Sequence, residues 1–497
     1  MNATDLKARL ARVDDVDLSA AFAVHGAVVD VGDGVAHAVG LDQVGAEELV
    51  AFDSGGLGMA YELAPDHAGI VLLSGADAVC AGQGVRPLRR LPSLPVGDDL
   101  LGRVVDPLGT PLDDRPPPVG EPRPLLGDAP SLTARAPVQR PLLTGVMVID
   151  AAVPIGRGQR QLLVGDRNVG KTSLALDIVA AQRRGDVACV YVVIGQPISR
   201  VLGICEALRR SDAMANTVVV AAEAADPPGL QYLAPYAGAT VAEAFRQEGR
   251  DALVVYDDLT KHADAYRELA LLLGRPPGRE AFPGDIFYIH AQLLERATAL
   301  ADSAGGGSVT AFPIVETTDS DISAYIPTNL ISITDGQIYL DSARFERNQR
   351  PAVDIGKSVS RVGGAAQPPA LRQAARNLRI IMSRFEALEA LTRVGLDVDP
   401  HTRQAVERGR ILREVLRQPR FTVRSVSEQI LALTAVAEGW LDKLAPERAR
   451  AVLQAARVPL RSELGELTAT LDAGRESPDD WKQRMQALVQ RLAGSAS

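Results

Sequence analysis

The stretch Gly165-Asp-Arg-Asn-Val-Gly-Lys-Thr172 indicates the fold class of this chain. It follows the apolar run Gln161–Val164 and opens into Ser173-Leu-Ala-Leu-Asp-Ile-Val179, so a strand, a glycine-rich turn and a helix are expected in succession. In such a turn the glycines let the backbone wrap phosphates, the lysine neutralises their charge and the threonine hydroxyl is a ligand for Mg²⁺. The spacing therefore predicts a site for a nucleoside triphosphate with Mg²⁺.

Around this turn, apolar runs alternate with helical stretches from about residue 140 to residue 340. The runs that we expect to be strands are Gln161–Val164, Ala188–Ile194, Thr217–Ala222, Ala252–Tyr256, Ser308–Ile314 and Leu330–Thr334. Such alternation predicts a mostly parallel sheet covered by helices, with ligands at the carboxyl ends of the strands.

One of these strands, Ala252–Tyr256, runs directly into Asp257 and Asp258. A carboxylate at that end of a strand lies beside the phosphate loop, where it can hold a water of the Mg²⁺ shell. We favour this role for Asp257. The alternative is that the aspartate caps the helix that follows.

The sequence on either side of the sheet has a different pattern. Short β-type runs separated by Gly-Asp and Pro-Asp turns predict a small barrel between residues 20 and 90; they are Ala23–Val31, Gly34–Val39, Glu48–Phe52 and Gly69–Leu73. After Pro369 apolar residues recur at helical spacing, which predicts a helical domain. At 497 residues the chain is long enough for two or three such domains.

Composition excludes several classes of protein. No apolar run approaches the roughly 20 residues of a membrane span, and the charged first residues do not form a secretory signal. The three cysteines are too few and too far apart for a disulfide framework or a zinc site. A net charge of −9 disfavours a nucleic-acid partner. We expect a cytosolic chain, or one that is held at a membrane through partners.

Further segments make a specific resemblance. Together with the phosphate loop, the chain resembles the alpha subunit of F-type ATP synthases over nearly its whole length. The segments that carry the resemblance are Val153-Pro-Ile-Gly-Arg-Gly-Gln-Arg160, Leu230-Gln-Tyr-Leu-Ala-Pro-Tyr236, Tyr256-Asp-Asp-Leu-Thr-Lys261, Arg275-Pro-Pro-Gly-Arg-Glu-Ala-Phe-Pro-Gly-Asp285, Ser323-Ala-Tyr-Ile-Pro-Thr-Asn329 and Ser358-Val-Ser-Arg-Val-Gly363. The resemblance implies an N-terminal helix and β-barrel (1–90), a RecA-like nucleotide-binding domain (91–365) and an α-helical bundle (366–497).

The resemblance also bears on whether this copy hydrolyses ATP. In the catalytic beta subunit a glutamate ends the strand after the phosphate loop, whereas here Val192-Val-Ile-Gly-Gln196 ends in glutamine. From the residue alone the question stays open, since some GTPases orient their water with a glutamine. The alpha pattern implies a bound nucleotide without turnover, and Arg361 reaching into the neighbouring beta site as an arginine finger.

Site residues follow from the same resemblance. It implies ATP or ADP with Mg²⁺, the metal being held by Thr172 and, through water, by Asp257. The residues expected around the nucleotide are Gly165, Asp166, Arg167, Asn168, Val169, Gly170, Lys171, Thr172, Ser173 and Gln196, with Phe345, Arg350 and Gln418 near the base. The chain departs from the usual pattern at Asn168-Val169, at the acidic stretch Asp319-Ser-Asp321 and at Gln418-Pro-Arg420.

The implied partners are three catalytic beta subunits that alternate with three alpha subunits, a gamma shaft and, indirectly, the ion-conducting membrane sector at the cytoplasmic face of a bacterial membrane. Leu6, Leu10 and Val13 form an apolar stripe, so residues 3–14 are expected to be a helix that docks on the delta subunit of the peripheral stalk. The rival classes are a catalytic rotary ATPase subunit, a B-type subunit of vacuolar or archaeal rotary ATPases, which usually lacks an intact phosphate loop, and a Rho-like RNA motor. The segment 20–90 lacks the interleaved aromatic and basic residues expected of an RNA-binding domain.

Overall fold

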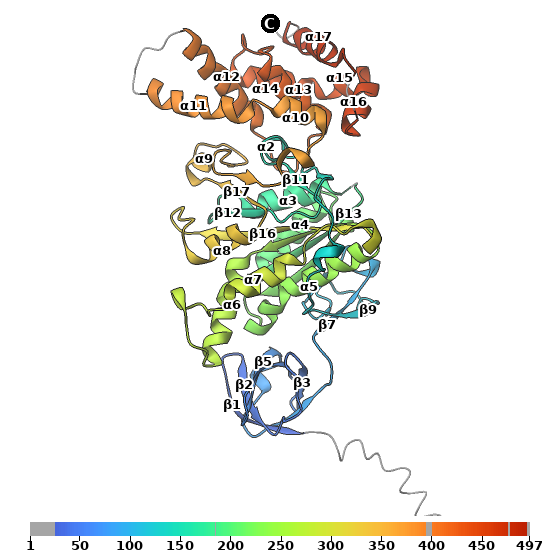
Figure 1. Ribbon diagram of the computed structural model, residues 1–497, viewed down its shortest axis with the longest axis vertical. Coiled ribbons are helices and arrows are strands. Elements are labelled where there is room, and N and C mark those ends of the chain that lie inside the picture. The colour runs from blue at the N-terminus through green and yellow to red at the C-terminus, as the bar shows by residue number, and fades with distance from the viewer. Residues whose placement is uncertain (1–24, 184, 394–399, 476–477, 495–497) are drawn as a thin grey trace, which may run out of the picture.

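The computed structural model describes residues 25–183, 185–393, 400–475 and 478–494. Three bodies are stacked along the long axis of the molecule, with the barrel at one end, the sheet and its helices in the middle and a helical domain at the other end (Figure 1). The proposed docking segment 3–14 lies outside the described residues. The domain limits at residues 90 and 365 remain a proposal.

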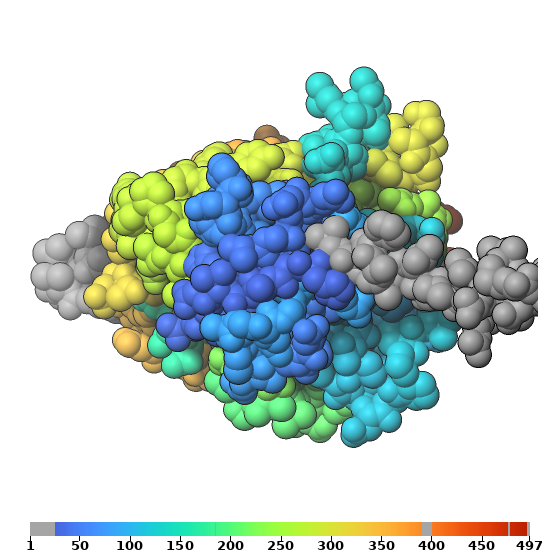
Figure 2. All heavy atoms as spheres, turned by 90° about the horizontal axis from the view of Figure 1, so that it is seen from below, coloured from blue at the N-terminus to red at the C-terminus, as the bar shows by residue number. Residues whose placement is uncertain are grey.

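The N-terminal body is a closed antiparallel barrel, as the short runs predict, and it covers one end of the molecule (Figure 2). Its strands pair in the order β1-β2-β5-β4-β3-β6. The tight turn between β1 and β2 places Asp33 and Gly34 at positive φ, which suits a two-residue hairpin turn. The bounds are β1 (Gly26–Gly32), β2 (Val35–Val39), β3 (Leu49–Phe52), β4 (Leu57–Leu63), β5 (Ala68–Ser74) and β6 (Gly84–Pro87).

The central sheet has the strand order β18-β17-β12-β16-β15-β13-β14-β8, with β18 antiparallel to β17 and the other pairs parallel. Its buried faces are apolar, as expected for parallel strands covered by helices. The strands are β8 (Val104–Val105), β12 (Leu162–Asp166), β13 (Val187–Gln196), β14 (Thr217–Glu223), β15 (Asp251–Asp257), β16 (Ser308–Thr317), β17 (Gly336–Leu340) and β18 (Val359–Ser360). Two short pairs lie outside it: β7 (Ser93–Val96) with β9 (Glu121–Pro124), and β10 (Pro141–Leu142) with β11 (Ile155–Gly156).

Helices of the middle body cover this sheet on both sides (Figure 1). On one face α3 and α4 share a core with the helical domain, and on the other α5, α6, α7 and α8 share a second core. Their bounds are α2 (Met147–Ala152), α3 (Lys171–Ala181), α4 (Ile198–Arg210), α5 (Pro228–Gln247), α6 (Leu259–Leu272), α7 (Ile286–Glu295), α8 (Tyr325–Ile333) and α9 (Ser342–Glu346).

One expected strand is wrong. The run Leu330–Thr334 lies mostly in helix α8 and at its end, and the strand follows it as β17. Ile326 and Leu330, four residues apart, are both buried, so the apolar residues here follow a helical period. The β-branched residues of the run favour a strand by propensity, but burial of the helix face decides the structure.

After Pro369 every described element is helical, which confirms the expected C-terminal helical domain. Leu371, Leu378, Met382 and Phe385 are buried in its core. The helices are α10 (Pro369–Ala375), α11 (Leu378–Arg393), α12 (Pro400–Leu416), α13 (Val426–Ala437), α14 (Pro446–Ala455), α15 (Arg457–Glu463), α16 (Gly465–Asp472) and α17 (Trp481–Gly494). In the described part of the chain, no helix combines the length and the apolarity that a membrane crossing needs.

Candidate nucleotide-binding site

The predicted phosphate loop connects the carboxyl end of β12 to the first residue of α3. A Cβ atom at Gly165 would lie 2.5 Å from the carbonyl oxygen of Leu340, so only glycine fits between the loop and β17. Gly170 has φ +100 and Asn168 has φ 62. Asparagine tolerates this left-handed conformation better than most residues, which gives a physical reason for the departure at Asn168. Val169, the other departure in the loop, is buried.

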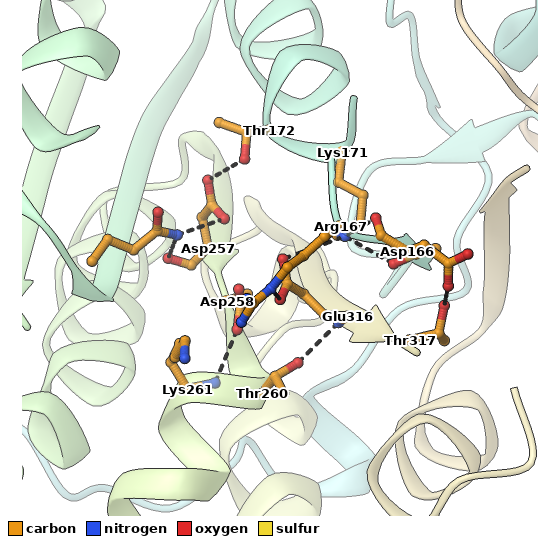
Figure 3. Close-up of polar contacts among 12 residues, drawn as sticks. Asp166, Arg167, Lys171, Thr172, Asp257, Asp258, Thr260, Lys261, Glu316 and Thr317 are labelled. Atoms are coloured by element: carbon orange, nitrogen blue, oxygen red, sulfur yellow. Dashed lines mark hydrogen bonds and ion pairs between the residues drawn. The ribbon is translucent and has the colours of Figure 1, made fainter. Parts of the chain in front are cut away.

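Lys171 is buried at the start of α3, with a relative exposure of 6%. Its Nζ donates to the carbonyl oxygens of Gly165 at 2.8 Å and Asp166 at 2.7 Å, and lies 3.6 Å from a carboxylate oxygen of Glu316 (Figure 3). Burial lowers the pKa of Lys171, and the nearby carboxylates oppose this shift. The lysine is thus held inside the loop that it is expected to serve.

Asp257 ends β15 directly opposite this loop (Figure 3). Its Oδ2 accepts hydrogen bonds from the Thr172 hydroxyl at 2.9 Å and the Tyr191 hydroxyl at 2.8 Å. Burial raises the pKa of Asp257, while those two hydrogen bonds oppose the rise. The cap of α6 is the next residue, Asp258, whose Oδ1 accepts from the Lys261 amide at 2.9 Å. The helix cap considered for Asp257 is therefore supplied by Asp258, and the Mg²⁺ role of Asp257 stays a prediction.

Gln196 ends β13 and faces Asp257. Its Nε2 donates to the carbonyl oxygen of Asp257 at 3.2 Å and to Oδ1 at 3.1 Å. The carboxamide is thus turned with its donor side toward the buried carboxylate. A neutral amide in this position can orient a polar group but cannot accept a proton as a general base does.

The acidic stretch Asp319-Ser-Asp321 supports the loop from the end of β16. Asp166 accepts hydrogen bonds from the amide and hydroxyl of Ser320, both at 2.8 Å, and from the hydroxyls of Thr317 and Ser342. These bonds hold the pKa of Asp166 to about 2. Asp321 instead accepts from Ser323 within its own turn. Ser320 therefore ties the phosphate loop to the neighbouring strand.

Two cavities meet at the start of α3. The first, about 330 Å³, lies over the loop and has Lys171, Thr172, Gln196 and Asp257 in its wall; we call it the phosphate-side cavity. Polar residues with oxygen and nitrogen atoms dominate it, and oxygen is the ligand that Mg²⁺ prefers. The glycine cradle, the anchored lysine and the adjacent hydroxyl and carboxylate fit a nucleotide's phosphates and a divalent cation.

The second cavity, about 250 Å³, lies on the far side of Gly170 and Ser173, which line both. Phe345 and Arg350 line it, with the guanidinium 4.5 Å from the ring centroid. Gln418 also lines it, but its Oε1 accepts from the Met147 amide at 3.1 Å and its Nε2 donates to the Gly145 carbonyl at 2.7 Å. The carboxamide of Gln418 is therefore engaged within the chain, and its contact with a base stays a prediction.

Asp177 in α3 also lines this second cavity, and its Oδ1 accepts a hydrogen bond from the Phe421 amide at 2.7 Å. Burial raises the pKa of this carboxyl from 3.8 to about 6. Because the folded chain holds this proton more tightly than the unfolded chain, Asp177 contributes to the free energy of unfolding. The contribution is full below about pH 4 and is lost as the pH rises through about 6. The free energy of unfolding then falls by an amount on the order of 2–3 kcal/mol.

We expect Asp177→Asn to remove this pH dependence while it keeps an acceptor for the Phe421 amide. Between pH 5 and pH 8 the thermal midpoint of the wild type should fall by more than that of the variant, because only the wild type must ionise the buried carboxyl of Asp177. Scanning calorimetry of the purified chain at both pH values measures this. Parallel shifts in the two proteins would contradict it.

Arg361 lies away from both cavities. It follows β18, which pairs with the first residues of β17, so it is at the amino end of the sheet. From there to the loop end of β17 is about 13 Å at about 3.3 Å per residue. Its amide donates to the Asp335 carbonyl at 2.8 Å, and its side chain is exposed. Gly165 and Asp166 belong to the loop but line neither cavity, whereas the structure brings the remaining expected site residues, apart from Arg361, into the walls of the two cavities.

Several residues of the phosphate-side cavity were not expected from the sequence. Glu316 binds the exposed Arg167 guanidinium at 3.0 Å and lies at the end of a buried strand, the same signal that pointed to Asp257. Arg200 and Lys261 also line the cavity. They come from helices α4 and α6, and no sequence signal distinguishes them from other surface cations.

Comparison with known families covers nearly the whole chain. Residues 145–360 match the nucleotide-binding domain of the ATP synthase alpha/beta family. Residues 22–89 match the β-barrel domain of that family, and residues 367–492 match its C-terminal domain.

Individual relatives agree with these matches. The chain is 48% identical to ATP synthase subunit alpha 1 of Rhodopirellula baltica over 471 residues, which is 95% of this chain and 93% of the relative. It is also 48% identical to ATP synthase subunit alpha of Aquifex aeolicus over 440 residues, or 88% of each chain.

Proposed function

Because this chain belongs to the ATP synthase alpha/beta family, in which it is an F-type alpha subunit, we propose that it binds ATP or ADP without hydrolysing it. It is part of an ion-translocating ATPase complex. Its own contribution to that chemistry is an arginine offered to a neighbouring subunit. The observation that carries the proposal is an intact phosphate loop facing a glutamine, Gln196, at the position of the catalytic base.

The phosphate-side cavity is the proposed nucleotide site. Lys171 and the loop amides would hold the phosphates, while Thr172 and, through water, Asp257 would hold Mg²⁺. When bound, this cation neutralises charge on the phosphates. The base would lie beyond Gly170 in the second cavity, against Phe345 and Arg350. The other residues that we expect near the phosphates are Asp166, Arg167, Asn168 and Val169 in the loop and Ser173 in the first turn of α3.

Turnover requires a group that accepts a proton from, or firmly orients, the attacking water. Gln196 donates both of its observed hydrogen bonds to Asp257 and has no basic atom. Asp257 itself already accepts from Thr172 and Tyr191 and lies buried. We therefore expect the chain to retain nucleotide and to leave the chemistry to its neighbours.

Arg361 is the residue proposed to act on a neighbouring site. Its distance along β17 from the phosphate loop prevents it from serving its own nucleotide. Within the described residues its exposed guanidinium has no ion-pair partner, so it is available at the surface of the domain. A guanidinium placed against a transferring phosphoryl group stabilises the charge that develops there.

The complex contains beta and further subunits. We propose the finer arrangement of three copies of this chain alternating with three beta subunits around a gamma shaft. Residues 3–14 would dock on the delta subunit of the peripheral stalk, and the assembly would lie at the cytoplasmic face of a bacterial membrane as its peripheral part. The barrels would form one rim of the ring and the helical domains the other.

Native mass spectrometry of the complex purified through a tag on this chain tests the arrangement. We expect equal numbers of this chain and of a second chain of the same family that has glutamate at the Gln196 position. A ring made of this chain alone would instead indicate a catalytic rotary ATPase subunit. Co-purification with RNA in place of ATPase subunits would indicate an RNA motor, and either result would contradict the proposal.

A further inference from the structure

Arg200 is a cation of the phosphate-side cavity that the motif does not include. It lies in the first turn of α4, and its Nη2 donates to the Thr172 hydroxyl oxygen at 3.1 Å. Val201, Ile204 and Leu208 bury the other face of α4, so the helix holds Arg200 at the cavity wall. Within the part of the chain that the structure describes, no carboxylate lies within ion-pair distance of this guanidinium.

The hydroxyl that Arg200 contacts is the one proposed to bind Mg²⁺. Thr172 donates its proton to Asp257 at 2.9 Å, which leaves its oxygen lone pairs for a cation or a donor. Arg200 uses one of them. A divalent cation on the same oxygen would meet the positive guanidinium at close range and be repelled by it. The two cations therefore compete for Thr172.

We propose that Arg200 stands in for the divalent cation at this site, giving up Thr172 when Mg²⁺ binds. The inference rests on the proposed function, since it assigns a role at the same nucleotide site. Without Mg²⁺ the guanidinium supplies positive charge beside Lys171, where the phosphates of a nucleotide bind. With Mg²⁺ the metal takes Thr172 and the guanidinium is displaced. The chain then holds nucleotide with less dependence on Mg²⁺ than a phosphate loop without such an arginine.

Nucleotide affinity with and without Mg²⁺ tests this proposal directly. The dissociation constant of ATP is measured for the purified full-length chain by equilibrium dialysis, once in EDTA and once in excess Mg²⁺. We expect Arg200→Ala to raise the ratio of the dissociation constant in EDTA to that in Mg²⁺ about tenfold, since the variant loses a charge-assisted contact with the nucleotide only in EDTA. The Mg²⁺ concentration that gives half of the maximal increase in ATP affinity should fall in this variant, because the guanidinium that competes with Mg²⁺ is gone.

Two further variants control for structural effects. Arg210→Ala removes the same charge from the exposed end of the same helix, where the side chain pairs with Glu206, and should keep the wild-type ratio. Arg200→Lys keeps a positive charge and should restore most of the binding in EDTA. A merely structural role for Arg200 would weaken binding equally in both conditions and leave the ratio unchanged, which would overturn the inference.

The outcomes separate this inference from the proposed function. Failure of the wild-type chain to bind ATP in either condition would overturn both. Wild-type binding with an unchanged ratio in Arg200→Ala would overturn the role of Arg200 alone.

Discussion

Arg361→Lys in the assembled complex is expected to lower kcat on the order of 10³-fold while nucleotides still bind at the catalytic sites. Lysine keeps the charge of Arg361 but has a single ammonium in place of the planar guanidinium fork, which can contact two phosphate oxygens at once. The loss should therefore lie in the chemical step. Steady-state kinetics together with nucleotide binding to the purified complex would measure both quantities.

The position of Arg361 sharpens this expectation. Because the residue lies at the amino end of the sheet, its replacement should leave nucleotide binding by the chain itself unchanged. Arg210→Lys, an equal change at an exposed arginine of the same domain, is the matched control and should keep the wild-type kcat. An unchanged kcat in Arg361→Lys would show that the finger is another residue.

Lys171→Ala is expected to weaken binding of Mg-ATP to the purified chain by about 100-fold or more. The substitution removes a buried positive charge from the phosphate loop and leaves the carbonyl oxygens of Gly165 and Asp166 without their donor. Charged hydrogen-bond partners of this kind contribute about 1.5–3 kcal/mol each. Isothermal titration with Mg-ATP measures the loss, and Lys482→Ala on the exposed surface of α17 controls for loss of a lysine charge.

In the complex, the same substitution separates two proposed roles of this chain, which are to bind nucleotide at its own loop and to supply Arg361 to a neighbouring site. Lys171→Ala should empty the chain's own site, yet single-turnover hydrolysis at the neighbouring catalytic sites should persist. If hydrolysis vanished together with binding by this chain, the chemistry would take place at its own loop.

The sequence predicts the centre of the site well because one short segment contains both its fold and its chemistry. A strand, a loop with fixed glycines and a helix are local features, and β12 and α3 begin and end near the expected positions. Asp257 could be expected because an apolar strand that ends in an acid marks the carboxyl edge of a sheet. The same signal also applied to Glu316.

Tertiary packing decides the features that the sequence did not predict. Leu330–Thr334 has the composition of a strand, but the burial of Ile326 and Leu330 makes it helical. Gln418 resembles a base contact, yet its amide is engaged by residues 145 and 147, far away in the chain. Arg200 reaches Thr172 only because α4 packs beside α3, and spacing along the chain gives no indication of that contact.

The departures from the family pattern also divide into those that local sequence explains and those that depend on tertiary contacts. Asn168 is explained by its own backbone conformation, which local reasoning about asparagine could reach. The role of Ser320 depends on Asp166, a residue 154 positions away, and follows only from the structure.

The central claim is that this chain holds nucleotide without hydrolysing it, and turnover by the purified chain tests it most directly. Labelled Mg-ATP is bound to the isolated chain, and the nucleotide is recovered and analysed over time. We predict that the bound nucleotide stays ATP, with release of phosphate at the level of the Lys171→Ala control. Robust phosphate release by the wild type that Lys171→Ala abolishes would contradict the account.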